Sequence, residues 1–185
     1  MKKLILVFLF LVIAMLYNSC SDNNPSAPNL NKNEQPVALA KVKTTFTGQC
    51  TPVASIEPAN ELPLPNGKIL SEGETAYWYD LADESLVTGI SKWYINRIIY
   101  EDGSQKIWGK AKIFVGTDPN TENPEITNDG IWEISWHGWL TTTPEIVCDA
   151  VGTGMSGDVK GMTAHWVYTF NFGPYQYDTE GYILK

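Results

Sequence analysis

Apolar and polar residues alternate with a period of two along most of the chain after residue 40, which is the pattern of strands with one buried face. No stretch of ten or more residues in this part carries a helical apolar stripe. Asp102-Gly103 is typical of a tight hairpin, and Pro58, Pro63 and Pro65 with Asn66-Gly67 make residues 51–67 an irregular connection. The expected strands are Lys41–Gln49, Lys68–Tyr79, Leu86–Tyr100, Gln105–Gly116, Ile131–Thr142, Glu145–Met155, Met162–Phe172 and Asp178–Leu184.

The order of these strands predicts an all-β fold, because short strands joined mostly by hairpins form an antiparallel meander. Eight such strands can close on themselves and leave no edge open to aggregation, so an antiparallel eight-stranded barrel is expected. A two-sheet β-sandwich is the alternative, since periodicity does not separate the two architectures.

Two of the expected strands show clearly different faces. In Ile131–Thr142 one face carries Trp132, Ile134, Trp136 and Leu140, and the other carries Glu133, Ser135, His137 and Trp139. Met162–Phe172 repeats the pattern, with an aromatic row that includes Trp166 and a polar row that includes His165. Both histidines of the chain therefore lie on polar strand faces.

The first twenty residues have the pattern of an export signal. Lys2 and Lys3 precede thirteen apolar residues, Leu4–Leu16, which fit a secretory signal and are too short to span a bilayer. The following Tyr17-Asn18-Ser19-Cys20 resembles the lipobox of bacterial lipoproteins. Residues 1–19 are thus expected to be a lipoprotein signal peptide and Cys20 the lipidated residue. The alternative is an ordinary cleavage site.

Residues 20–40 form the expected tether between the lipid and a domain that covers residues 41–185. The tether is polar and rich in proline and asparagine, so it has almost nothing to bury. Two or three acyl chains on Cys20 would hold the protein to a membrane. The sequence therefore predicts an exported protein whose partner is the membrane, lipid-anchored to the bacterial outer membrane or cell surface.

The net charge bears on the possible partners, and the cysteine content bears on disulfide formation. The formal net charge is −8, and removal of residues 1–19 makes it more negative by two, which argues against nucleic acid as a partner. With Cys20 lipidated, Cys50 and Cys148 are left as a candidate disulfide. It would close a loop of about 100 residues, on the order of 4 to 5 kcal/mol in the chain-entropy model. Two buried free thiols are the alternative.

The glycine pattern resembles that of the allene oxide cyclase-like and dirigent-like β-barrels. The resemblance rests on Asp129–Gly138, on Val151-Gly152-Thr153-Gly154 with Gly157 and Gly161, on Asp102–Gly109 and on Gly181–Leu184. It covers residues 85–185 and implies a small barrel. None of the family's catalytic positions can be placed on this sequence, so the resemblance implies no activity.

Three candidate motifs lack the structural context that their chemistry requires. Gly152-Thr153-Gly154-Met155-Ser156-Gly157 matches a dinucleotide fingerprint but lacks the following helix, so no nucleotide site is expected. Glu133 and His137 lie about 13 Å apart on a strand and cannot ligate one ion, so no metal is predicted. No serine lies in a nucleophile elbow. No cofactor and no catalytic residue are therefore assigned.

The seven tryptophans and nine tyrosines are the remaining signal, and they suit either a barrel core or a ligand surface. Candidate ligand-lining residues are Glu133, His137, His165 and Trp139. The first functional hypothesis is a non-enzymatic envelope lipoprotein that binds a small apolar or glycan ligand. The alternatives are a cyclase or isomerase that uses the barrel cavity, and a structural or assembly protein at the cell surface.

Overall fold

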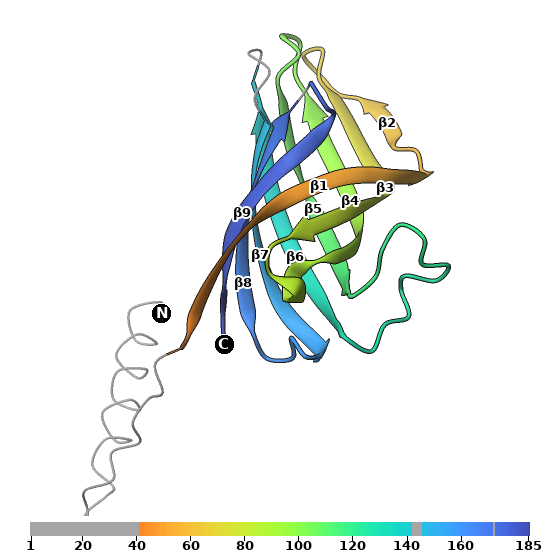
Figure 1. The fold of residues 1–185 in the computed structure, drawn as a ribbon. Helices are drawn as coiled ribbons and strands as arrows, with labels where there is room; N and C mark the ends of the chain where they lie inside the picture. Colours follow the sequence, from red (N-terminus) through yellow and green to blue (C-terminus); the bar gives the residue numbers. More distant parts are fainter. Residues whose placement is uncertain (1–40, 142–145, 172) are drawn as a thin grey trace, which may run out of the picture. The chain divides into compact units, whose positions relative to one another are not determined.

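Nine antiparallel strands and one short 3-10 turn account for most of the described chain (Figure 1). The computed structural model describes residues 41–141, 146–171 and 173–185. The strands are β1 (Lys43–Glu57), β2 (Asn60–Pro63), β3 (Ile69–Ala82), β4 (Gly89–Ile99), β5 (Gln105–Val115), β6 (Gly130–Leu140), β7 (Ile146–Gly157), β8 (Thr163–Asn171) and β9 (Gln176–Leu184), and the turn is η1 (Ser85–Val87). No helix in these ranges is long and apolar enough to cross a membrane.

Eight of the strands close into a barrel, which confirms the predicted architecture over the sandwich. Strands β3 to β9 pair in chain order, and β1 lies between β9 and β3. The first half of β1 pairs with β9, where Phe46 faces Gly181, and its second half pairs with β3, where Cys50 faces Asp80. β2 is an additional strand on β3. Closure pairs the backbone groups that an open sheet would expose at two of its edges.

The predicted irregular connection over residues 51–67 is wrong for most of its length. β1 continues to Glu57, and β2 follows after two residues. Pro58 and Pro65 lie outside the strands. Pro52 adjoins a register shift in β1 and Pro63 lies in the edge strand β2, two places where a missing N–H is tolerated. The hairpin from β2 to β3 uses Asn66 and Gly67, both with positive φ, as their turn propensity indicates.

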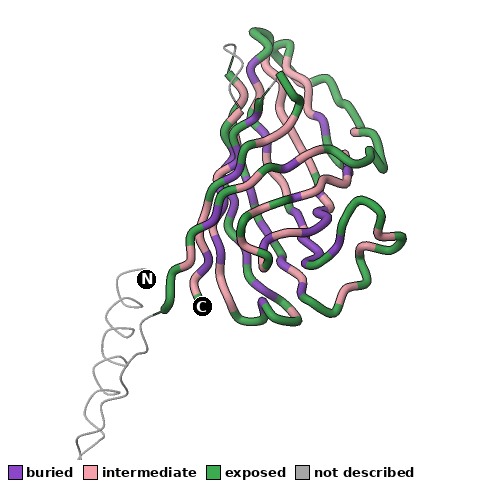
Figure 2. Tube along the Cα trace, in the orientation of Figure 1, coloured by how far each residue is buried: buried purple, intermediate pink, exposed green. Residues whose placement is uncertain are grey.

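The barrel interior is filled by one row of side chains from each strand, as the alternation predicted. Figure 2 shows buried positions alternating with exposed ones along the strands. Trp132, Ile134 and Trp136 of β6 are buried, and so are Trp166 and Tyr168 of β8. These side chains belong to a single core cluster, so the domain carries its own hydrophobic core.

Two glycines of the predicted pattern lie where backbones come very close. A Cβ on Gly109 would lie 1.8 Å from the carbonyl oxygen of Tyr94, and one on Gly154 would lie 1.8 Å from that of Val159. Neither site has room for a side chain, which is the close backbone approach expected of glycine in a small, strongly coiled barrel.

The two ends of the barrel differ. One end carries the start of the described chain and its C-terminus, where Val42 and Lys185 exchange two backbone hydrogen bonds. The opposite end carries the β4–β5 hairpin at Tyr100–Ser104, the ends of β6 and β8 and the starts of β7 and β9 (Figure 1). The described chain therefore begins at the end of the barrel opposite this hairpin.

Candidate ligand-binding cavity

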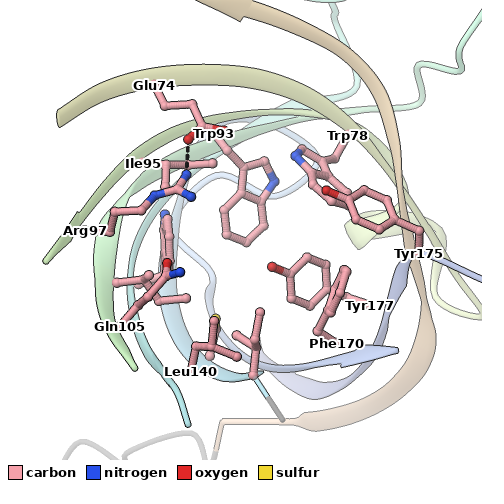
Figure 3. Close-up of a pocket in the computed structure, with 14 residues that line it drawn as sticks. Glu74, Trp78, Trp93, Ile95, Arg97, Gln105, Leu140, Phe170, Tyr175 and Tyr177 are labelled. Atoms are coloured by element: carbon pink, nitrogen blue, oxygen red, sulfur yellow. Dashed lines mark hydrogen bonds and ion pairs between the residues drawn. The ribbon is translucent and has the colours of Figure 1, made fainter. Parts of the chain in front are cut away.

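A cavity of about 250 Å³ lies inside the barrel at the end opposite Val42 and Lys185. It is lined by the last inward-facing residues of β4, β6 and β8 and by the first ones of β5, β7 and β9. The side chains in Figure 3 surround an open centre. The strand rows that fill the middle of the barrel thus leave this end partly empty.

Aromatic rings form most of the wall, and they hold each other in place. The rings of Trp93 and Trp136 meet edge to face at 5.0 Å, and those of Trp78 and Tyr177 meet at 5.3 Å. Phe170 packs on Tyr177 at 4.8 Å. Such contacts add to area burial and restrict the rings. The cavity is therefore bounded by side chains that are already ordered without a ligand. Aliphatic residues complete the apolar lining: Ile95, Ile107, Leu140 and Ile146.

The polar part of the lining is small and contains one ion pair. Arg97 of β4 pairs with Glu74 of β3, and about a quarter of each side chain remains exposed (Figure 3). Burial lowers the pKa of the Arg97 guanidinium. The pair leaves this wall close to neutral, because each charge is compensated by the other. Gln105 and Cys148 are the other non-aromatic polar groups of the lining.

Two hydrogen-bond donors of the lining have no partner. In the described part of the chain, three buried side-chain polar atoms lack one: Thr75 Oγ1, Arg97 Nε and Trp136 Nε1. Arg97 and Trp136 both line the cavity, and Trp136 is only 5% exposed. A buried donor without an acceptor costs about 1 to 3 kcal/mol. Both N–H groups are buried within the wall, so each is an unsatisfied donor of the folded protein.

A buried polar cluster lies beneath the cavity, centred on Asp80 of β3. Ser91 Oγ donates to Asp80 at 2.5 Å, and Tyr168 Oη donates to it at 3.1 Å. The indole of Trp93, which lines the cavity, donates to Ser91 Oγ at 2.8 Å. Burial raises the pKa of Asp80 from 3.8 to about 6, against the opposing effect of hydrogen bonds from Ser91, Tyr168 and Cys50. Asp80 is therefore largely protonated near pH 5, and Ser91 connects it to Trp93 in the cavity wall.

Sequence reasoning missed Asp80 because the expected strand ended one residue earlier, at Tyr79. An acidic residue before Leu81 and a turn resembles a solvent-exposed strand end. The alternation of side chains along the strand could have revealed it, because Asp80 follows Ala76 and Trp78 at intervals of two residues and so shares their inward face of β3. Arg97 was missed for a similar reason, since it occurs near the end of a long apolar strand.

The four candidate ligand-lining residues lie on the outer wall. Glu133 is exposed and 3.0 Å from Lys112 Nζ, and Trp139 is 43% exposed beside the ring of Tyr100. His137 is exposed as well. His165 is half-buried, stacks on Tyr182 and lies 3.8 Å from Asp149.

None of these four lines the interior cavity, because each has the outward parity of its strand. A ligand role for them on the outer surface stays a prediction. Among the described residues, no three His, Cys, Asp or Glu side chains are grouped so as to hold a metal ion.

The predicted disulfide is absent, since Cys50 and Cys148 are both buried free thiols. Their strands, β1 and β7, are separated around the barrel by β9 and β8. Three strand spacings amount to about 14 Å, whereas a disulfide needs Cα atoms within roughly 7 Å. Burial raises the pKa of both thiols, that of Cys148 to about 12. Cys20 lies outside the described residues.

The chain was compared with models of protein families, with curated proteins and with solved structures, and no match was found. The cavity therefore has to be interpreted from its own shape and chemistry.

Proposed function

We propose that the protein is a lipid-anchored protein of the bacterial cell envelope whose barrel binds a small apolar ligand. The observation that carries the binding role is the cavity of about 250 Å³ with its ordered aromatic lining. Ligand sites are typically concave, mostly apolar, and provided with a few convergent polar groups. Cavities for drug-sized ligands begin near 300 Å³, so the ligand proposed here is smaller than that.

The proposed location in the cell envelope is supported by the sequence of residues 1–20, which has a basic start, an apolar stretch and a cysteine after Ser19. The cavity opens at the barrel end opposite Val42, where the described chain begins. A tether that joins the barrel near Val42 would therefore be attached at the end away from the cavity.

Of the two ligand classes expected from the sequence, the apolar one has more support than the glycan. Sugars carry many hydroxyl groups, and each needs a hydrogen-bond partner when it is buried. The cavity supplies few, since most of its lining is aromatic or aliphatic. The aromatic rings are also packed on one another edge to face, so they form a closed wall more than an open stacking platform.

A binding role has more support than catalysis. The cyclase hypothesis relied on Glu133, His137 or His165 as the proton-transferring group, and all three lie on the outer wall. Inside the cavity, the carboxylate of Glu74 is held by Arg97, and Asp80 lies in the layer below. Membership of the allene oxide cyclase-like and dirigent-like barrels remains part of this proposal, supported by the closed barrel and its glycines.

The proposal is tested by native mass spectrometry of residues 37–185 purified from the envelope of the source organism. We expect a retained small-molecule adduct. Leu140→Trp, which places an indole in the cavity, should abolish the adduct. Val147→Trp, on the outer face of the neighbouring strand, should retain it. An adduct that survives Leu140→Trp would refute binding in this cavity, and the absence of any adduct from the wild-type domain would count against a carrier role.

A further inference from the structure

The outer face of β5 carries a row of basic and aromatic side chains. The residues that alternate with its core positions point outward and are Lys106, Trp108, Lys110 and Lys112. On the neighbouring strand β4, Tyr94 faces Lys110 and Lys92 faces Lys112 in the antiparallel pair. Four of the thirteen Lys and Arg residues of this acidic chain therefore lie on the outer surface of two adjacent strands.

Two of these lysines have no carboxylate partner. Two acids contact this face and both are already paired, Glu125 with Lys92 at 2.8 Å and Glu133 with Lys112 at 3.0 Å. Lys106 and Lys110 are exposed, and neither forms an ion pair with a carboxylate in the described part of the chain. Their charges are therefore not compensated by the protein and are available to an anion.

A hollow of about 640 Å³ adjoins Lys110 on the outer surface of β4 to β7. Its lining includes the ring of Tyr94, which is 38% exposed, and the polar side chains of Glu133, Ser135 and Thr153. Two apolar side chains of β7 complete it. A sugar needs an aromatic or apolar surface for its ring and hydrogen-bond partners for its hydroxyl groups. The hollow provides both, whereas the interior cavity provides few polar groups.

The spacing of the row bears on the kind of anion that fits it. Lys106 and Lys110 are four residues apart, or about 13 Å along the strand, and the half-buried ring of Trp108 lies midway between them. Trp139, which is 43% exposed, faces Lys106 across the β5–β6 pair. Cations and rings therefore alternate along this face, as expected for a polymer whose charged units are separated by neutral rings.

Nucleic acid fits the same row less well. A DNA strand carries one phosphate about every 3.4 Å, which is about four over the interval between the two unpaired lysines. The net charge of −8 on the whole chain opposes so dense a polyanion. A polysaccharide with a carboxylate on alternate sugars brings fewer charges to the same length, so two lysines can match it.

We propose that the outer face of β4 to β7 binds an acidic polysaccharide in which uronic acids alternate with neutral sugars. Lys110 and Lys106 bind successive carboxylates, a neutral sugar between them packs on Trp108, and Tyr94 contacts the sugar in the hollow. Each exposed contact is weak, so affinity comes from several contacts along one polymer. The site is separate from the interior cavity, and the inference goes beyond the proposed function without depending on it.

The test is isothermal titration calorimetry of residues 37–185 at low salt. One probe is a hyaluronan hexasaccharide, in which glucuronate and N-acetylglucosamine alternate, and the second is its methyl ester, which keeps the rings and loses the charges. The acid should bind about tenfold more tightly than the ester, because two lysine contacts are lost. Polyglutamate and single-stranded oligothymidylate of similar length should bind more weakly than the hexasaccharide.

Two variants locate the site. In Lys106→Gln/Lys110→Gln the acid and the ester should bind equally, whereas Lys43→Gln/Lys160→Gln, with the same change of net charge elsewhere on the surface, should keep the preference for the acid. Tyr94→Thr should weaken both ligands about fivefold.

Three results would overturn the inference. No binding of the hexasaccharide would contradict the site as a whole, and equal effects of the two double variants would contradict its location. Ester binding as tight as that of the acid would contradict the role of the lysines. Polyglutamate or oligothymidylate that binds as tightly as the hexasaccharide would replace the glycan with polyanions in general.

Discussion

Replacement of the buried acid by its neutral isostere, Asp80→Asn, should change how the stability of the barrel depends on pH. Burial raises the pKa of Asp80 from 3.8 in the unfolded chain to about 6 in the folded protein. A shift of about 2 units corresponds to about 3 kcal/mol of folding free energy. The shift is that large because the acid is fully buried, and hydrogen bonds from Ser91 and Tyr168 offset only part of the desolvation.

The sign follows from the direction of the shift. Below pH 3.8 the acid is protonated in both states, and the stability associated with its protonated form is fully present. As the pH rises towards 6, the unfolded chain releases its proton while the folded protein keeps it, so the free energy of unfolding falls. Above about pH 6 the loss is complete. Asp80→Asn stays neutral throughout and should not show this loss.

The assay is urea unfolding of residues 37–185, followed by tryptophan fluorescence between pH 4 and pH 7.5. The difference in unfolding free energy between Asp80→Asn and wild type should move by about 2.5 kcal/mol in favour of the variant across this range, since part of the shift already lies below pH 4. Cys50 and Tyr168, which face Asp80, do not titrate there, because burial raises the pKa of each further above its ordinary value.

The matched control is Asp158→Asn, an exposed carboxylate, which should follow the wild-type curve. A difference between Asp80→Asn and wild type that is constant with pH would refute the assignment of a raised pKa to Asp80. The same trend in Asp158→Asn would attribute the effect to overall charge.

Three further outcomes are expected. Gly154→Ala should destabilise the barrel by at least about 1 to 3 kcal/mol in urea unfolding, because its Cβ would lie 1.8 Å from a backbone oxygen. Gly173→Ala should cost much less, because its Cβ would meet only the side chain of Asn171, at an ordinary contact distance of 3.4 Å, and equal effects would contradict the packing argument. Cys50 and Cys148 should both react with a maleimide in unfolded protein that has never met a reductant, and absence of labelling would show that a disulfide forms after all. Cys20→Ala in the full chain should release the protein from the membrane fraction or leave it unprocessed, and unchanged fractionation would rule out the lipid anchor.

Much of the fold could be predicted because strand signals are local. The alternation in β6 and β8 identified Trp132 and Trp166 as core residues, and both are fully buried. The Asp102-Gly103 hairpin is present, with positive φ at Gly103 and the Asp102 carboxylate accepting bonds from Ser104. Each of these features depends on residues close together in the chain, so their pattern is visible without the fold.

The candidate site could not be predicted in the same way. The polar and aromatic content of β6 drew attention to His137 and Trp139, which share the outward parity of their strand. The cavity instead depends on how much of the interior the inward rows of eight strands fill, and it lies where Arg97, Trp136 and Phe170 come together from three strands. A local sequence pattern does not predict how much of the barrel interior the side chains of eight strands fill together.

The sequence by itself determined the strand content and the inward and outward faces of the clearest strands, and it predicts an N-terminal export signal. Only the tertiary structure decided that β1 bridges β9 and β3, that Cys50 and Cys148 lie too far apart to pair, and that the interior stays open at one end. The physical reason is the separation along the chain of the residues that interact. Period-two alternation and turn propensity are properties of neighbouring residues, whereas closure, register around the barrel and the volume left unfilled are set by contacts between residues that are distant in the chain.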